Sequence, residues 1–298
     1  MWQRGPEGEV ARAAPPPPTP ASADEGASEP AARPRKRASI ALALRLGLRD
    51  TYDSLGTVLL ISVLWSVLLS SAALGGQALG QALHGRLPGQ LPLLLAAFAV
   101  LAGLALVGGP LLGGIFRYAR NVAARREPEV LDLLWGFRSA LRPSLALGAL
   151  HFGGVTLLAG NAAFYFTQRG FVPVLLGTVF AYTLGFWLLM MGYQWPLLVG
   201  QEDDAPAPRV RTALRKSVLL LLDNTPFTLV TAGAALLLSL VVWLTMVGGV
   251  LLWAGALAML QTHATRELLR KYEVLPPDPT LDPIAAETHE LGGHGRHE

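Results

Sequence analysis

The sequence predicts an all-α polytopic membrane protein with six transmembrane helices and amphipathic helices on the cytoplasmic side. Of its 298 residues, 52% are hydrophobic and 15% are charged, whereas soluble domains carry about 25% charged residues. A membrane-spanning helix needs roughly 20 apolar residues. The apolar runs found here lack the alternation of barrel strands, which favours helices. Six runs contain no Lys, Arg, Asp or Glu: 57–79, 91–116, 144–166, 171–199, 226–246 and 247–265.

Composition divides the chain into three parts. Residues 1–36 are rich in Ala, Pro and Glu and hold few large apolar side chains, too few to offset the entropy lost on ordering. We therefore expect a disordered cytoplasmic tail over 1–36. The membrane domain of six spans is expected over 37–274, and a flexible cytoplasmic tail over 275–298.

The last two runs leave two alternatives, because they meet around Val247, Gly248 and Gly249 without a charged residue between them. They form either two spans joined by a tight turn or one span followed by a re-entrant segment. The segments outside the runs carry, in order, 8, 1, 6, 1, 4, 0 and 4 Lys and Arg residues. Basic residues concentrate in cytoplasmic loops, so this alternation favours six spans with both termini in the cytoplasm.

Residues 37–56 show the periodicity of a short amphipathic helix before the first run. Ile40, Leu44 and Leu48 recur every four residues, as one face of a helix requires. Leucine at every second position from 42 to 48 would also suit a strand. We expect a helix on the cytoplasmic membrane surface. Its polar side would be formed by Arg45, Arg49, Asp50 and Asp53.

Two cytoplasmic loops are long enough to hold amphipathic helices of their own. The first, 127–143, contains several large apolar side chains and is expected to end at Pro143. The second, 209–222, places apolar and basic residues on opposite faces. It is followed by Asn224 and Pro226, which separate it from the next span.

The runs contain few polar side chains and no carboxylate, which counts against a transporter driven through an intramembrane acid. His151 lies in the third run, and Tyr182 and Gln194 lie in the fourth. One hypothesis is an intramembrane polar pocket in which these three side chains contact a substrate. The alternative is interhelical hydrogen bonding that holds the bundle together, worth about 0.6 kcal/mol per contact.

Small residues indicate close helix packing. Gly109 and Gly113 form a G-x-x-x-G pattern in the second run, which lets two helix backbones approach closely. Both packing within one chain and homo-oligomerisation use such a pattern. Pro110 lies between the two glycines, and we expect it to kink this span.

Common catalytic and cofactor motifs are missing from the sequence. There is no Cys, no H-E-x-x-H, no G-x-S-x-G and no P-loop. We therefore expect no enzyme activity, no cofactor and no metal site. The basic cluster at 33–37 suits anionic lipid headgroups, and no accompanying signal indicates nucleic-acid binding.

Three stretches follow one another in a recognisable order: PLLGGIFRYARNVAARREPEVLDLLWGFRSALRPSL (110–145), WPLLVGQ (195–201) and TRELLRKYE (265–273). Together they resemble the YesL-like family of bacterial integral membrane proteins. That family shows an Asp-aromatic-x-x-Gly-Phe-Arg run, which here extends from Asp132 to Arg138 with Leu133 in place of the aromatic residue. The resemblance implies a location in the bacterial cytoplasmic membrane. It also implies an accessory role in transport, because members often accompany carbohydrate-uptake systems. It carries over no catalytic residue.

We therefore expect a non-enzymatic membrane protein that assists or regulates a transporter. We expect the contact surface for transporter subunits to consist of Trp135, Phe137 and Arg138. Their cytoplasmic loop contains large apolar and basic side chains, whereas the spans contain no charged residue and no catalytic motif. The alternative is a permease in its own right, which would move a neutral or amphiphilic small solute.

The expected topology is tested by a reporter fused after Gly248. With six spans and a cytoplasmic N-terminus, the junction between the last two runs lies outside the cytoplasm. An alkaline phosphatase fusion at this point should be active, and a fluorescent protein fusion dark. The opposite pattern would contradict the six-span topology.

Overall fold

The computed structural model describes residues 38–201, 209–272 and 274–275, which all belong to one compact unit of the chain, 37–298. Every regular element among these described residues is helical, which confirms the predicted all-α class. The predicted tail 1–36 lies outside the described residues, and so does the predicted tail 275–298 apart from residue 275.

The described part contains ten α-helices and one π-helical segment. Six helical stretches are long and apolar enough to cross a membrane, and this confirms six membrane-spanning helices, including two separate ones for the last two runs. The elements are α1 (Ile40–Asp53), α2 (Leu55–Leu83), α3 (Leu91–Gly103), η1 (Leu104–Gly108), α4 (Gly109–Ala123), α5 (Leu131–Ser139), α6 (Leu141–Thr167), α7 (Phe171–Gly200), α8 (Val210–Asp223), α9 (Thr225–Leu244) and α10 (Val247–Lys271).

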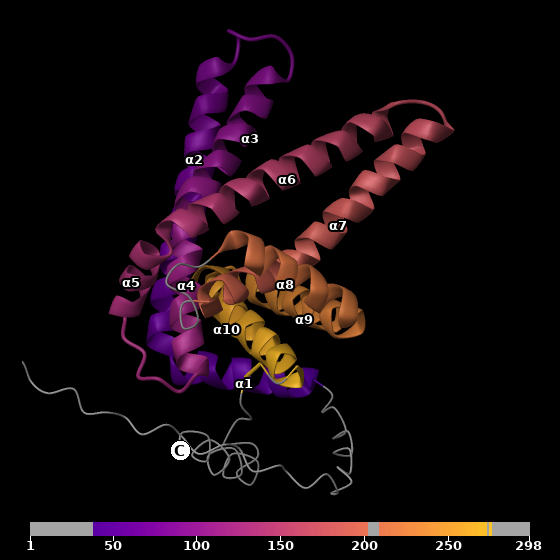
Figure 1. The fold of residues 1–298 in the computed structure, drawn as a ribbon. Helices are drawn as coiled ribbons and strands as arrows, with labels where there is room; N and C mark the ends of the chain where they lie inside the picture. Colours follow the sequence, from indigo (N-terminus) through magenta and orange to yellow (C-terminus); the bar gives the residue numbers. More distant parts are fainter. Residues whose placement is uncertain (1–37, 202–208, 273, 276–298) are drawn as a thin grey trace, which may run out of the picture. The chain divides into compact units, whose positions relative to one another are not determined.

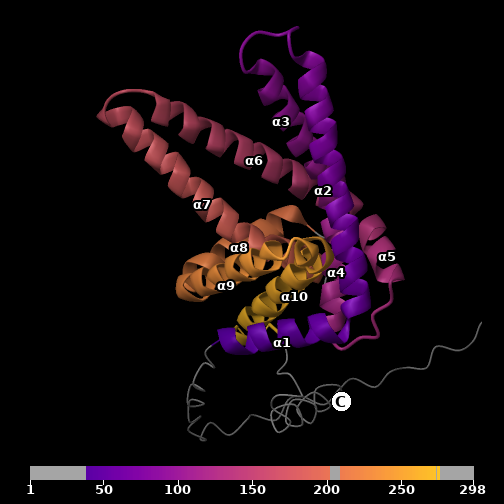
Figure 2. The same ribbon diagram turned by 180° about the vertical axis from the view of Figure 1, so that it is seen from behind.

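The spans are arranged as helical hairpins around α10. Helices α2 and α3, α6 and α7, and α9 and α10 pack as sequential pairs, and α10 also contacts α1, α2, α4 and α7. In Figures 1 and 2 the α2–α3 and α6–α7 hairpins diverge as they extend away from α1. Helix α10 has 56% of its apolar window buried, against 11–22% for the other spans. It is therefore the central span of this unit.

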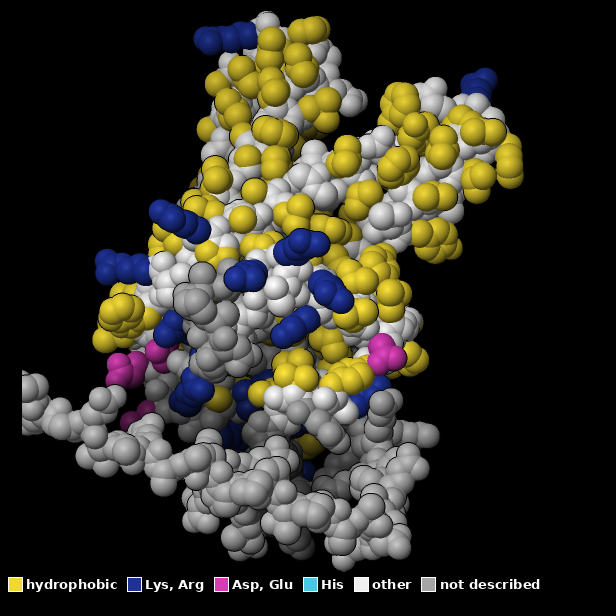
Figure 3. Space-filling model, in the orientation of Figure 1, with side chains coloured by type: hydrophobic (Ala, Val, Ile, Leu, Met, Phe, Trp, Pro, Cys, Tyr) yellow, Lys and Arg dark blue, Asp and Glu magenta, His cyan; other side chains and the backbone are white. Residues whose placement is uncertain are grey.

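Charged residues of the described part gather at one end of the helices, which we call the charged end. It consists of α1, α5, α8, the adjoining ends of α4, α6 and α10, and the loops that join them. The exceptions are Arg86 and Arg169, which lie in the loops at the far ends of the α2–α3 and α6–α7 hairpins. Figure 3 shows the acidic side chains only near the charged end, whereas hydrophobic side chains cover the hairpins.

The second span contains the irregularity that its proline requires. Pro110 lacks an amide hydrogen, and its ring disfavours a regular preceding turn; the π-helical segment η1 ends two residues before it. Gly109 and Gly113 face Ser144 of α6, and a Cβ on either glycine would lie 2.8 Å or 2.6 Å from a Ser144 oxygen. This structure therefore uses the G-x-x-x-G face for packing within the chain.

Proline positions define the starts of two spans. Helix α9 begins at Thr225 with Pro226 in its first turn, as the sequence indicates. The expectation that Pro143 ends the preceding helix is wrong, because α5 ends at Ser139 and Pro143 lies in the first turn of α6. A first-turn residue has no intrahelical acceptor for its amide, so proline is tolerated there.

The predicted surface helix is α1, which starts at Ile40 and is capped by Ser39. The Ser39 hydroxyl oxygen accepts a hydrogen bond from the Leu42 amide at 3.3 Å. Asp50, expected on the polar side, is instead fully buried. Its Oδ1 accepts from Arg125 Nη1 at 2.8 Å, and its Oδ2 lies 2.8 Å from His263 Nε2. The carboxylate thus joins α1 to the end of α4 and to α10.

The surroundings of Asp50 favour its ionised form. Burial acts to raise the pKa of the carboxyl, but the hydrogen bonds and charges of His263 and Arg125 outweigh burial and hold the pKa below its ordinary value. Arg125 has a φ of 57°, in the left-handed region, directly after α4. This conformation turns the chain at the residue that reaches Asp50.

We expect Asp50→Asn to destabilise the protein, because asparagine keeps the volume but removes the buried charge that both partners need. Each weakened charge-assisted hydrogen bond costs about 1.5–3 kcal/mol. The melting temperature in mild detergent measures the loss. Asp53→Asn is the matched control, since Asp53 pairs with Arg49 at 3.4 Å on an exposed face, where an ion pair contributes little. Equal melting temperatures for the two variants would contradict the role of the buried network.

Candidate functional site

Helix α5 carries an exposed apolar surface at the charged end, which we call the α5 face. Figure 3 shows this group of hydrophobic side chains at the left of the view. Leu134 and Trp135 are 62% and 63% exposed. Exposed apolar groups gathered in this way mark interaction sites. The α5 face comprises Val130, Leu131, Leu134 and Trp135.

The three residues predicted as a contact surface are all on α5. Trp135 belongs to the α5 face, and Arg138 is exposed one turn later. Phe137 is 37% exposed, so it is less accessible than Trp135. All three side chains therefore reach the surface, and Trp135 presents the largest accessible apolar area of the helix.

The opposite side of α5 is held tightly against α4. Leu133 and Gly136 are buried there. A Cβ on Gly136 would lie 2.8 Å from the Gly114 Cα and 2.9 Å from the Arg117 Cβ. The two backbones approach this closely because both contact positions are glycine. The α5 face is consequently presented by a firmly packed helix.

Polar contacts fix both ends of α5. At the start, Asp132 Oδ2 accepts from Asn121 Nδ2 at 3.0 Å and from the Glu129 amide at 3.1 Å. At the end, Arg117 Nη1 donates to Ser139 Oγ at 3.0 Å. Both Asn121 and Arg117 belong to α4. The contacts therefore orient α5 on α4 as well as attaching it.

The residues of the predicted intramembrane polar pocket differ in their surroundings. His151 on α6 and Gln194 on α7 are buried, whereas Tyr182 is 78% exposed. Tyr182 lies twelve residues before Gln194 in α7, which is about 18 Å along a helix axis. The structure therefore buries both His151 and Gln194, and it places Tyr182 apart from Gln194.

Aromatic rings surround the buried His151. Its ring centroid lies 5.8 Å from that of Trp187 and 6.1 Å from that of Trp195. Within the part of the chain that the structure describes, neither ring nitrogen of His151 and neither amide atom of Gln194 has a hydrogen-bond partner. Buried polar groups are usually paired, so both side chains depart from the usual arrangement.

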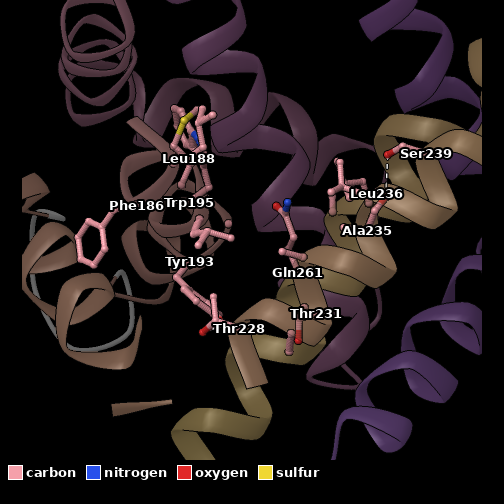
Figure 4. Close-up of a pocket in the computed structure, with 18 of the residues that line it drawn as sticks. Phe186, Leu188, Tyr193, Trp195, Thr228, Thr231, Ala235, Leu236, Ser239 and Gln261 are labelled. Atoms are coloured by element: carbon pink, nitrogen blue, oxygen red, sulfur yellow. Dashed lines mark hydrogen bonds between the residues drawn. The ribbon is translucent and has the colours of Figure 1, made fainter. Parts of the chain in front are cut away.

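A cavity of 1390 Å³ lies between α7 on one side and α9 and α10 on the other. Figure 4 shows its lining, which is largely apolar and aromatic. Tyr182 is among the lining residues. The sequence does not reveal this cavity, because its walls come from helices far apart in the chain. The one feature of the sequence that hints at the cavity is the set of hydroxyl and amide side chains in the fourth, fifth and sixth runs.

The described residues include no group of three or more His, Cys, Asp or Glu side chains arranged to hold a metal ion. Comparisons of the chain with protein-family models, with curated proteins and with solved structures find no match. The resemblance to the YesL-like family therefore stays an expectation from the sequence.

We expect Gly136→Ala to loosen α5, because the added methyl group collides with backbone and side-chain atoms of α4. Overpacking of this kind costs about 1–3 kcal/mol. Faster trypsin cleavage within 124–130, together with a lower melting temperature, would report the change. Gly153→Ala is the control, since nothing lies within 4 Å of a Cβ at that position. Identical cleavage of both variants would contradict the tight α4–α5 contact.

Proposed function

We propose that this chain is a non-enzymatic membrane protein that binds a partner membrane protein, such as a transporter subunit, through the α5 face. The observation that carries the proposal is an exposed apolar surface on a helix whose other side is packed without room for a single methyl group. A preorganised surface loses little entropy on binding. Trp135 and Arg138 are residue types that dominate binding energy at protein interfaces.

The charges beside the α5 face favour a protein partner over the bilayer surface. Glu127 and Glu129 are exposed in the loop that enters α5, and Asp132 lies in its first turn. Figure 3 shows acidic side chains next to the apolar patch. Anionic lipid headgroups attract basic segments and repel carboxylates. Arg138 and Arg142 are exposed at the other end of α5, so charges of both signs flank the α5 face. A protein surface with both signs of charge around an apolar centre complements this arrangement better than a uniformly anionic headgroup surface.

The orientation and the location belong to the same proposal. We place the charged end, and with it both termini, in the cytoplasm, because loops rich in Lys and Arg stay on that side. We place the protein in the bacterial cytoplasmic membrane on the basis of the YesL-like resemblance. That resemblance also supports a role beside carbohydrate-uptake systems, so a transporter subunit is the first partner to test.

The cavity favours a second candidate, a permease for a small neutral or amphiphilic solute. Its volume is above the usual range of ligand pockets, about 300–1,000 Å³. Solute flux into liposomes that contain this protein alone would establish that class. Absence of flux, together with a stoichiometric partner in native membranes, would favour the binding role.

We expect Trp135→Ala combined with Arg138→Ala to reduce partner recovery when the protein is purified from native membranes in mild detergent. The partner is identified by mass spectrometry, and recovery should fall about 30-fold or more, since removing hot-spot residues costs about 2 kcal/mol or more. The matched control is Tyr52→Ala combined with Arg49→Ala, an exposed aromatic and an exposed basic residue on α1. Unchanged recovery with the α5 variant, or equal loss with both, would contradict the proposal.

A further inference from the structure

The cavity between α7 and α9–α10 opens toward the bilayer. Two residues of its lining, Tyr182 on α7 and Leu236 on α9, are 78% and 72% exposed and lie within apolar spans. Among the residues that the structure describes, the lining contains no Lys, Arg, Asp or Glu. An apolar space of this kind excludes water, and the molecules that meet its opening are lipids.

One hydroxyl of the lining is buried without a partner among the described residues. Thr231 is 9% exposed, and among the described residues its Oγ1 has no hydrogen-bond partner. The neighbouring Thr228 shows the usual arrangement, because its hydroxyl donates to the Asn224 carbonyl at 3.1 Å and pairs with Tyr193 at 2.8 Å. A buried hydroxyl without a partner is costly. Thr231 lines the cavity, and rotation of its side chain about χ1 to another staggered rotamer would offer this unused donor to a bound molecule.

Gln261 places a second polar group in the same lining. It belongs to α10 and precedes Arg266 by five residues, which is about 8 Å along the helix. Figure 4 shows Gln261 and Thr231 among the residues around the cavity. These two polar groups thus lie toward the charged end, near the depth where hydrocarbon gives way to headgroups. The hydroxyls of Thr178, Thr183 and Ser239 lie farther from that end, and each donates to a carbonyl of its own helix.

We propose that this cavity binds the acyl chains of a bilayer lipid, with a glycerol ester carbonyl accepting a hydrogen bond from the Thr231 hydroxyl. The long apolar walls match the chains, and the ester carbonyl matches an uncharged donor. The uncharged lining gives no preference for an anionic headgroup, so a zwitterionic phospholipid binds as well as an anionic one. This site is separate from the α5 face and does not depend on the proposed partner.

Two glycines make the site testable without disturbing the fold. Gly185 lines the cavity, and nothing lies within 4 Å of a Cβ at this position. A tryptophan there projects into the space that the chains would occupy. Gly153 on α6 also has nothing within 4 Å of a Cβ and does not line the cavity. Gly153→Trp therefore matches Gly185→Trp in its chemistry and in its membrane setting.

The experiment uses the full chain in nanodiscs of phosphatidylcholine that contain a trace of phosphatidylcholine with a diazirine in one acyl chain. After illumination, mass spectrometry maps the adducts. We expect saturable labelling at the cavity lining in the unchanged protein and in Gly153→Trp, and its loss in Gly185→Trp. Competition by unlabelled phosphatidylglycerol should be no stronger than by phosphatidylcholine.

The hydroxyl is tested by Thr231→Val, which keeps the shape of the side chain. Apparent affinity for the labelled lipid should fall about fivefold, as for loss of one hydrogen bond. The control is Thr178→Val in the same lining, because the Thr178 hydroxyl already donates to the Val174 carbonyl at 2.8 Å. Labelling confined to outer helix faces, labelling unchanged by Gly185→Trp, or cross-linking of Leu236 to a protein helix or a second copy would overturn the proposal.

Discussion

The buried carboxylate of Asp50 is the contact on which the charged end depends. It accepts from Arg125 and pairs with His263, so one side chain connects the surface helix α1, the end of α4 and the central span α10. A buried charge with one partner removed is strongly destabilising. Loss of either partner would therefore weaken the junction of these three elements, and α4 in turn supports α5.

The two ends of the spans follow different rules. At the charged end, glycine contacts and hydrogen bonds hold helices closely, as at Gly136 against Gly114. Away from it, the α2–α3 and α6–α7 hairpins diverge, and their apolar side chains are largely exposed. Apolar surface facing lipid has no hydrophobic drive to associate with other helices. A divergent arrangement that leaves a cavity between α7 and α9–α10 is consequently tolerable in a bilayer.

Prediction from sequence succeeded where a residue's role depends on its near neighbours. The charge-free runs identify the spans, and the four-residue periodicity of 37–56 identifies α1. It failed for Asp50, since the same periodicity places this residue on the polar side of α1. The partner His263 is 213 residues away in sequence, so no local pattern could indicate burial. Pro143 was misassigned for a simpler reason, because proline suits both the end of one helix and the first turn of the next.

The candidate sites divide in the same way. Trp135 and Arg138 were found from the sequence, because a short helix with large apolar residues between two spans is a local feature. Their firm presentation was not predictable, since it rests on glycine contacts between α4 and α5. His151 and Gln194 could be named as polar residues in apolar runs, but their burial follows from tertiary packing. The separation of Tyr182 from Gln194 follows from their spacing along the single helix α7. Sequence by itself determined the number of helical spans and the segments that form them, because hydrophobicity and hydrogen bonding within a helix are local. Only the tertiary structure decided which side chains meet, as in the Asp50 network and in the lining around Thr231, because those contacts join residues from separate helices.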